Sequence, residues 1–148
     1  MTDKPQRMKR IRFIVPGPPV GLEHEENRKG GGRRTATKSR KYMEHAGWHA
    51  MKAACDNQIK QGGYTGDTYL DLEIFYAREW PRPDPLNVAD ALQDGFTPVL
   101  WPNDRNVLAR VQSTWWPGKD DKPPPPALVV GGRYTGGVCC TVIPKGMK

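Results

Sequence analysis

The chain has 148 residues, the length of one ordinary domain, and 23 Lys and Arg against 16 Asp and Glu give it a formal net charge of +7. This excess of cations favours a polyanionic partner, while the absence of any apolar run near the roughly 18 residues of a membrane span, or of an apolar segment behind the charged start, predicts neither a membrane protein nor a signal peptide. Three cysteines without CxxC spacing predict neither a disulfide framework nor a zinc site and indicate a reducing cytoplasm.

The first expected strand covers residues 10–15, where Ile11, Phe13 and Val15 alternate with other positions. The "PGPP" turn that follows ends it, because proline cannot donate to a strand ladder. Residues 20–37 are expected to be loop.

A basic arm is expected over residues 20–41. Its stretch 28–41 holds seven cations and no acid. If the arm contacts phosphates, each neutralised phosphate releases a counterion and binding weakens steeply with salt. The alternative is a solvated loop. The cations that we predict to bind DNA are Arg33, Arg34, Lys38, Arg40 and Lys41.

The middle of the chain predicts a helix over about 39–60, from apolar residues at three- and four-residue steps, and a strand over 69–77, from strict alternation. A short helix over 84–94 follows, with Asp84 as N-cap, Pro85 at the first helical position and Gly95 as the stop signal.

The last third predicts a strand over 106–116, a Pro-rich surface loop over 117–126 and one or two short strands after it. The order β-α-β-α-β-β indicates a single α/β or α+β domain over residues 1–148, with a small mixed sheet and two main helices.

An acidic cluster stands out in this basic chain, within "RPDPLNVADALQDG" and the later "WPND". At about 100° per residue, Asp84, Asn87 and Asp94 fall within one arc of the helix, with Asp90 at its edge. A turn folded back beside the helix start would bring Asp104 to within about 4–7 Å of Asp84, close enough to share one metal. The alternative is that these acids are ordinary caps and turns.

Mg²⁺ suits such a site, because it takes oxygen ligands, needs few carboxylates and keeps several waters. A carboxylate-held Mg²⁺ beside a basic surface is what a phosphodiester nuclease requires. Two further groups of residues are weaker candidates. His45 and His49 at i, i+4 predict a helix surface rather than zinc. Trp101, beside the Asp104 turn, is the best of several tryptophans for stacking on a base, although core packing is the commoner role.

The motifs "FIVPGPPV", "RRTATKSRKY", "RPDPLN…ALQDG" and "LWPNDRNV", in this order over residues 11–115, resemble those of the RusA-type Holliday-junction resolvases of phages and prophages. The resemblance implies a homodimeric, Mg²⁺-dependent endonuclease (with Mn²⁺ as a possible substitute) that cuts branched, four-way DNA junctions. By position, Asp84, Asp94 and Asp104 match the family's metal-binding acids and Asn87 its asparagine.

The sequence departs from the family pattern at three positions. Leu86 stands where the second Asp of an Asp-x-Asp usually lies, Asp90 where a functional Lys lies, and Asn103 where the first Asp of a turn pair lies. Asp90 is the candidate for the missing carboxylate. Two further hypotheses therefore stay open: a catalytically impaired DNA-binding protein on the same fold, and a basic structural or RNA-binding protein whose aspartates are only caps.

Overall fold

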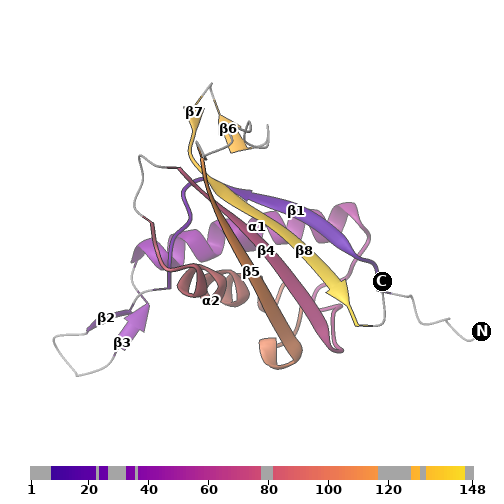
Figure 1. Cartoon of the computed structure of the whole chain (residues 1–148). Coiled ribbons are helices and arrows are strands. Elements are labelled where there is room, and N and C mark those ends of the chain that lie inside the picture. The colour runs from indigo at the N-terminus through magenta and orange to yellow at the C-terminus, as the bar shows by residue number, and fades with distance from the viewer. Residues whose placement is uncertain are drawn as a thin grey trace, which may run out of the picture.

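The computed structural model describes residues 8–22, 24–26, 33–35, 37–77, 82–116, 128–130 and 133–145. Its elements follow each other in chain order (Figure 1). They are β1 (Ile11–Pro16), β2 (His24–Glu26), β3 (Arg33–Thr35), α1 (Thr37–Asp56), β4 (Thr68–Ala77), α2 (Pro85–Phe96), a 3₁₀ turn η1 (Asp104–Asn106), β5 (Val107–Trp116), β6 (Val129–Val130), β7 (Arg133–Tyr134) and β8 (Gly137–Pro144).

A four-stranded mixed sheet organises the fold, with strand order β1-β8-β4-β5. β4 and β5 are parallel, and β8 pairs antiparallel with both β1 and β4. The three strands predicted at 10–15, 69–77 and 106–116 therefore share one sheet, as expected, but the chain's last strand lies between the first and the second. The small mixed α+β domain with two helices is confirmed.

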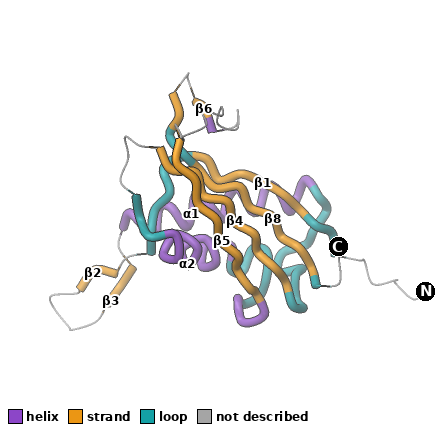
Figure 2. The backbone as a smooth tube through the Cα atoms, viewed as in Figure 1, coloured by secondary structure: helices purple, strands orange, loops and turns teal. Residues whose placement is uncertain are grey.

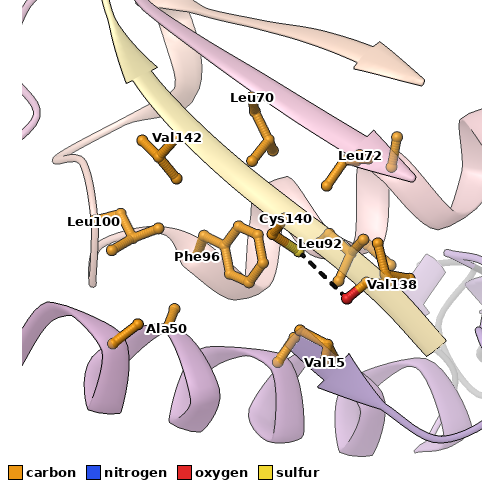
Figure 3. Packing of buried hydrophobic residues seen from close by; sticks show 14 of the residues in the cluster. Val15, Ala50, Leu70, Leu72, Leu92, Phe96, Leu100, Val138, Cys140 and Val142 are labelled. Atoms are coloured by element: carbon orange, nitrogen blue, oxygen red, sulfur yellow. Dashed lines mark hydrogen bonds between the residues drawn. The ribbon is translucent and has the colours of Figure 1, made fainter. Parts of the chain in front are cut away.

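One face of this sheet carries the hydrophobic core. Along β4, Leu70, Leu72 and Ile74 are buried while the residues between them are partly exposed. The buried side chains belong to the same cluster as Ala50 of α1 and Phe96 of α2, so both helices cover this face. Figure 3 shows the packing, including the Cys140 thiol, 4.0 Å from the carbonyl oxygen of Val138.

The two helices pack closely where Gly47 meets Gly95. A Cβ atom on Gly95 would lie 2.7 Å from the carbonyl oxygen of Met43, and one on Gly47 would lie 2.8 Å from the carbonyl oxygen of Gly95. Only residues without a side chain allow this approach. The prediction that Gly95 stops the helix is wrong, because α2 continues to Phe96 and is capped by Thr97.

The basic arm differs from the predicted loop. Its described parts form a two-stranded hairpin, β2–β3, which lies away from the main sheet near the start of α1 (Figure 2). The register pairs Glu25 with Arg34 and Glu26 with Arg33, so acidic positions oppose basic ones. The expected helix over 39–60 begins and ends earlier, at Thr37–Asp56. The Pro-rich loop 117–126 lies outside the described residues.

Among the helices that the structure describes, none combines the length and apolar character needed to cross a membrane.

Candidate functional site

The start of α2 forms as the sequence predicts. A carboxylate oxygen of Asp84, Oδ1, accepts a hydrogen bond of 2.8 Å from the backbone N–H of Leu86, and Pro85 occupies the first helical position. The N-cap and the third helical residue of such a start lie side by side, so Asn87 neighbours Asp84. Both residues are exposed, which places a carboxylate and an amide oxygen at the solvent edge of the helix start.

An acidic stripe runs from this start along the outer side of α2. Asn87, Asp90 and Asp94 are all exposed and follow each other at three- and four-residue steps, so each lies beside the next. Asp84 and Asp94 are ten residues apart, which is about 15 Å along a helix, too far to share one metal ion. Within the described ranges, no group of three or more His, Cys, Asp or Glu is arranged to hold a metal.

Asp104 lies at the opposite end of the sheet from Asp84. It begins η1, three residues before Val107, which pairs with Thr68 at the first position of β4. The carbonyl oxygen of Pro83, next to Asp84, accepts a hydrogen bond of 2.7 Å from the hydroxyl of Tyr76, near the last position of β4. A strand from Thr68 to Tyr76 spans about 26 Å. The prediction that Asp84 and Asp104 converge within one chain is therefore wrong.

The parallel pairing of β4 and β5 explains this separation. Two adjacent parallel strands are joined by a crossover, here α2, that carries the chain from the end of one strand back to the start of the next. A residue before the crossover helix and a residue after it consequently lie at opposite ends of the sheet. The sequence pattern of a turn before a strand does not reveal which end that turn occupies.

A basic surface lies at the start of α1. Lys38, Arg40 and Lys41 are exposed within its first turns, and no acid stands in the first turn. The guanidinium of Arg40 donates a 3.2 Å hydrogen bond to the Thr37 hydroxyl. The helix dipole is positive at an N-terminus, so cations there are unfavourable for folding but add to the attraction of an anion.

The segment 21–22 joins this basic surface to the start of α2. The buried hydroxyl of Ser39 donates a 2.8 Å hydrogen bond to the carbonyl oxygen of Gly21, and the N–H of Leu22 donates a 3.0 Å bond to the carbonyl oxygen of Asn87. A Cβ atom on Gly21 would lie 3.2 Å from Cβ of Asn87, so glycine permits this close contact. Residues 21–22 therefore join the start of α1 to the start of α2.

Arg82 joins the same end and was missed by the sequence reasoning. Its guanidinium carbon lies 5.0 Å from the ring centroid of Trp115 and 5.7 Å from that of Tyr76. Burial raises the pKa of Tyr76, Arg82 opposes this, and Asp84 adds to it. Arg82 is thus held at the carboxyl ends of β4 and β5, where ligands bind in open α/β sheets. In the sequence, only its position two residues before Asp84, in "RPD", pointed to Arg82.

Other candidates from the sequence have structural roles. Trp101 is fully buried and its indole N–H donates a 2.8 Å hydrogen bond to the Thr97 hydroxyl, so it does not stack on a base. His45 Nε2 lies 2.8 Å from the carbonyl oxygen of Pro16, and its ring packs edge-on against His49. Cys140 is completely buried, which raises the pKa of its thiol.

The predicted DNA-binding residues fall into two groups. Lys38, Arg40 and Lys41 lie in the first turns of α1, where Arg40 lines a hollow with Asp94, whereas Arg33 and Arg34 belong to the hairpin β2–β3. For Arg33 and Arg34, the structure describes only the backbone register.

Comparison of the sequence with models of protein families gives no match, and comparison with curated proteins gives none either.

Proposed function

We propose that this protein is a Mg²⁺-dependent endonuclease of branched DNA, such as four-way junctions, that acts as a homodimer. The observation that carries the proposal is that residues 21–22 join the basic first turns of α1 to the start of α2, where Asp84 and Asn87 lie. A phosphate held by the cations would lie near the carboxylate of Asp84 and the amide oxygen of Asn87.

The residues at the start of α2 fit Mg²⁺, which binds through one or two carboxylates together with waters and substrate phosphates. Asp84 and Asn87 would hold the ion, with Asp90 one turn further along; Asp94 lies too far along the helix to join Asp84. When bound, the ion would activate water and stabilise negative charge on the phosphate. The chain's own cations hold the DNA backbone and Arg82 adds a further positive charge beside Asp84.

Two observations favour a second function, in which the protein binds junctions without cutting them. Asp104 lies far from Asp84, so a chain by itself lacks the second metal-binding acid that the resemblance implies. Leu86, at the position of a missing carboxylate, is 68% exposed and packs into no core. On this alternative the helix starts remain a phosphate-binding surface and the acids are caps and solvated side chains.

Incubation of the protein with a synthetic four-way junction and with a duplex of matched sequence distinguishes these functions. The nuclease proposal predicts cleavage of the junction that requires Mg²⁺ or Mn²⁺ and is lost with chelator. Selective junction binding without cleavage under either metal selects the second function. Equal binding of duplex and junction, without cleavage, contradicts both.

A further inference from the structure

An open hollow lies beside the crossing of the two helices. Its volume is about 520 Å³, and its lining includes Arg40, Met43, Glu44, Trp48, Asp94 and Val99. Gly47 and Gly95, which contact each other at the crossing, line it as well and have no side chains to fill it. Met43 and Val99 also pack against the hydrophobic core, so the hollow has an apolar floor. The close crossing of the helices therefore leaves an apolar depression at the surface.

The indole of Trp48 borders this hollow in an exposed position. Trp48 is 53% exposed, and Met51, three residues further along α1, is 50% exposed and lines the same hollow. Adjoining large apolar side chains that remain in water mark a binding surface. The ring of His49 stands at 89° to the indole, with 4.9 Å between the ring centroids, and so supports it. An aromatic ring that is supported but largely uncovered can serve as a stacking platform.

Charged side chains surround this platform in a definite order. Along α1, Arg40 lies about 12 Å before Trp48 and Lys52 about 6 Å after it. The Nζ atom of Lys52 is 5.9 Å from the centroid of the Trp48 ring. Glu44 and Asp94 line the hollow itself. Cations therefore flank the platform on both sides, and carboxylates border the space beside it.

We propose that the hollow binds an unpaired base of a DNA strand, stacked on Trp48, with the neighbouring phosphates at Arg40 and Lys52. A base is a flat ring with N–H donors on its edge and a phosphate on either side. It therefore matches the indole, the carboxylates and the flanking cations together. A purely apolar partner would bury Glu44 and Asp94 without offering them a hydrogen bond, which is costly.

The proposal also defines the class of DNA that the protein prefers. A base within a duplex is paired and stacked between its neighbours, so it enters a protein pocket only after it has left the stack. Branched DNA with unpaired bases at the branch supplies such a base without this cost. The inference rests on the proposed function for its partner, DNA, and it adds the preference for unpaired bases.

The test measures DNA affinity by fluorescence anisotropy without Mg²⁺, so that no strand is cut. One DNA is a four-way junction with two unpaired nucleotides on one strand at the branch. The other is the same junction with these two nucleotides abasic, which keeps the phosphates and removes the bases. The unmodified protein is expected to bind the first junction about 5- to 100-fold more tightly, the range expected for one base stacked on an aromatic side chain.

Trp48→Ala completes a thermodynamic cycle with the abasic junction. The variant should lose this factor on the junction that has the bases, and it should bind both junctions equally, because one contact can be lost only once. Unchanged affinity for the abasic junction shows that the variant is folded. Trp48→Phe keeps an aromatic ring and should keep most of the preference. Leu108→Ala, which shortens a 58% exposed apolar side chain of β5, is the matched control.

Several outcomes would overturn the inference. They are equal affinity of the unmodified protein for the two junctions, losses from Trp48→Ala and from the abasic change that multiply, and no binding of either junction. A Trp48→Ala variant that keeps its DNA affinity but changes in molar mass would also overturn it and would indicate a second copy in the hollow. An intact cycle without cleavage in Mg²⁺ counts against the nuclease alone. Cleavage without any preference for unpaired bases counts against the inference alone.

Discussion

The two ends of α2 carry the same kinds of side chain in different surroundings. At its start, which carries Asp84 and Asn87, residues 21–22 join α2 to the first turns of α1. At its end, Asp94 and the following Asp104 turn lie with the helix crossing and the amino ends of the parallel strands. The comparison shows that acids of one sequence cluster are not one site. Asp94, unlike Asp104, also lines a hollow with Arg40 of the basic surface.

Substitution of Asp84 and of Asp104 should give the largest difference in junction cleavage. Asp84→Asn removes the carboxylate of the proposed metal site while it keeps the N-cap hydrogen bond. Junction cleavage is therefore expected to fall more than about 100-fold, beyond the usual effect of residues behind a metal ligand. Junction binding should persist, because a negative charge facing phosphate is lost. Gel assays of cleavage and binding measure both.

Asp104→Asn is the matched control for this change. It makes the same charge substitution at the far end of the sheet, and cleavage should stay near that of the unmodified protein. An equal loss in both variants would contradict the assignment and would place Asp104 of a second copy in the site.

The basic surface gives the next largest effect. Replacement of Lys38, Arg40 and Lys41 by Ala removes up to three phosphate contacts, so the slope of log affinity against log salt should become shallower by up to about 2.7. Fluorescence anisotropy with a labelled junction at several salt concentrations measures the slope. In the control variant, Ala replaces three exposed cations of the opposite end of the molecule, Lys60, Arg105 and Lys145. This variant should keep the slope of the unmodified protein. Equal slopes for the two triple variants would mean that DNA affinity depends on the total positive charge of the protein and not on where the cations lie.

Substitution at the helix crossing should change stability. Gly95→Ala forces a Cβ atom to within 2.7 Å of the Met43 carbonyl oxygen, so the free energy of unfolding is expected to fall by about 1–3 kcal/mol. Gly66→Ala, where nothing lies within 4 Å of the added atom, is the control. Urea unfolding measures both. No loss in the first variant would mean that the two helices separate at little cost.

The smallest effect concerns the interior of α1, just beyond the basic turns. The buried hydroxyl of Tyr42 has no hydrogen-bond partner within the described residues, and burial raises its pKa. Tyr42→Phe removes this unsatisfied group and should leave stability unchanged or raise it by about 1 kcal/mol.

Tyr64→Phe is the contrasting change. The Tyr64 hydroxyl donates a 2.6 Å hydrogen bond to the carbonyl oxygen of Lys9, so its loss should lower the free energy of unfolding by about 1 kcal/mol. Thermal or urea unfolding compares the two. A destabilised Tyr42→Phe would indicate that its hydroxyl has a partner in the remaining part of the chain.

Local signals predicted much of this fold. Alternation in residues 69–77 predicted β4, and Asp84 followed by Pro85 predicted the start of α2, because strand periodicity and helix capping depend on neighbouring residues only. Gly95 misled, since a helix stop and a close helix crossing both select glycine. Glycine is required at position 95 because the backbone there contacts Met43 and Gly47, which lie far away in the sequence.

The candidate site was predictable only in part for the same reason. The N-cap role of Asp84 is local, but its separation from Asp104 depends on the parallel pairing of β4 with β5. The contact that joins Ser39 to Gly21, and so the basic turns to the start of α2, is also a tertiary one. Trp101 shows the opposite case: its sequence neighbours suggested a base-stacking role, and core packing buries it completely.

We expect the metal and the phosphate to bind at the start of α2. Mn²⁺ added to the ¹⁵N-labelled protein tests it directly, because the paramagnetic ion broadens the amide signals nearest to it. With the metal at the start of α2, the amide signals of Leu86, Asn87 and Leu22 should broaden first, and those of Arg105 and Val107 should stay sharp at the same concentration. Broadening that begins at Arg105, or none at the start of α2, would contradict it.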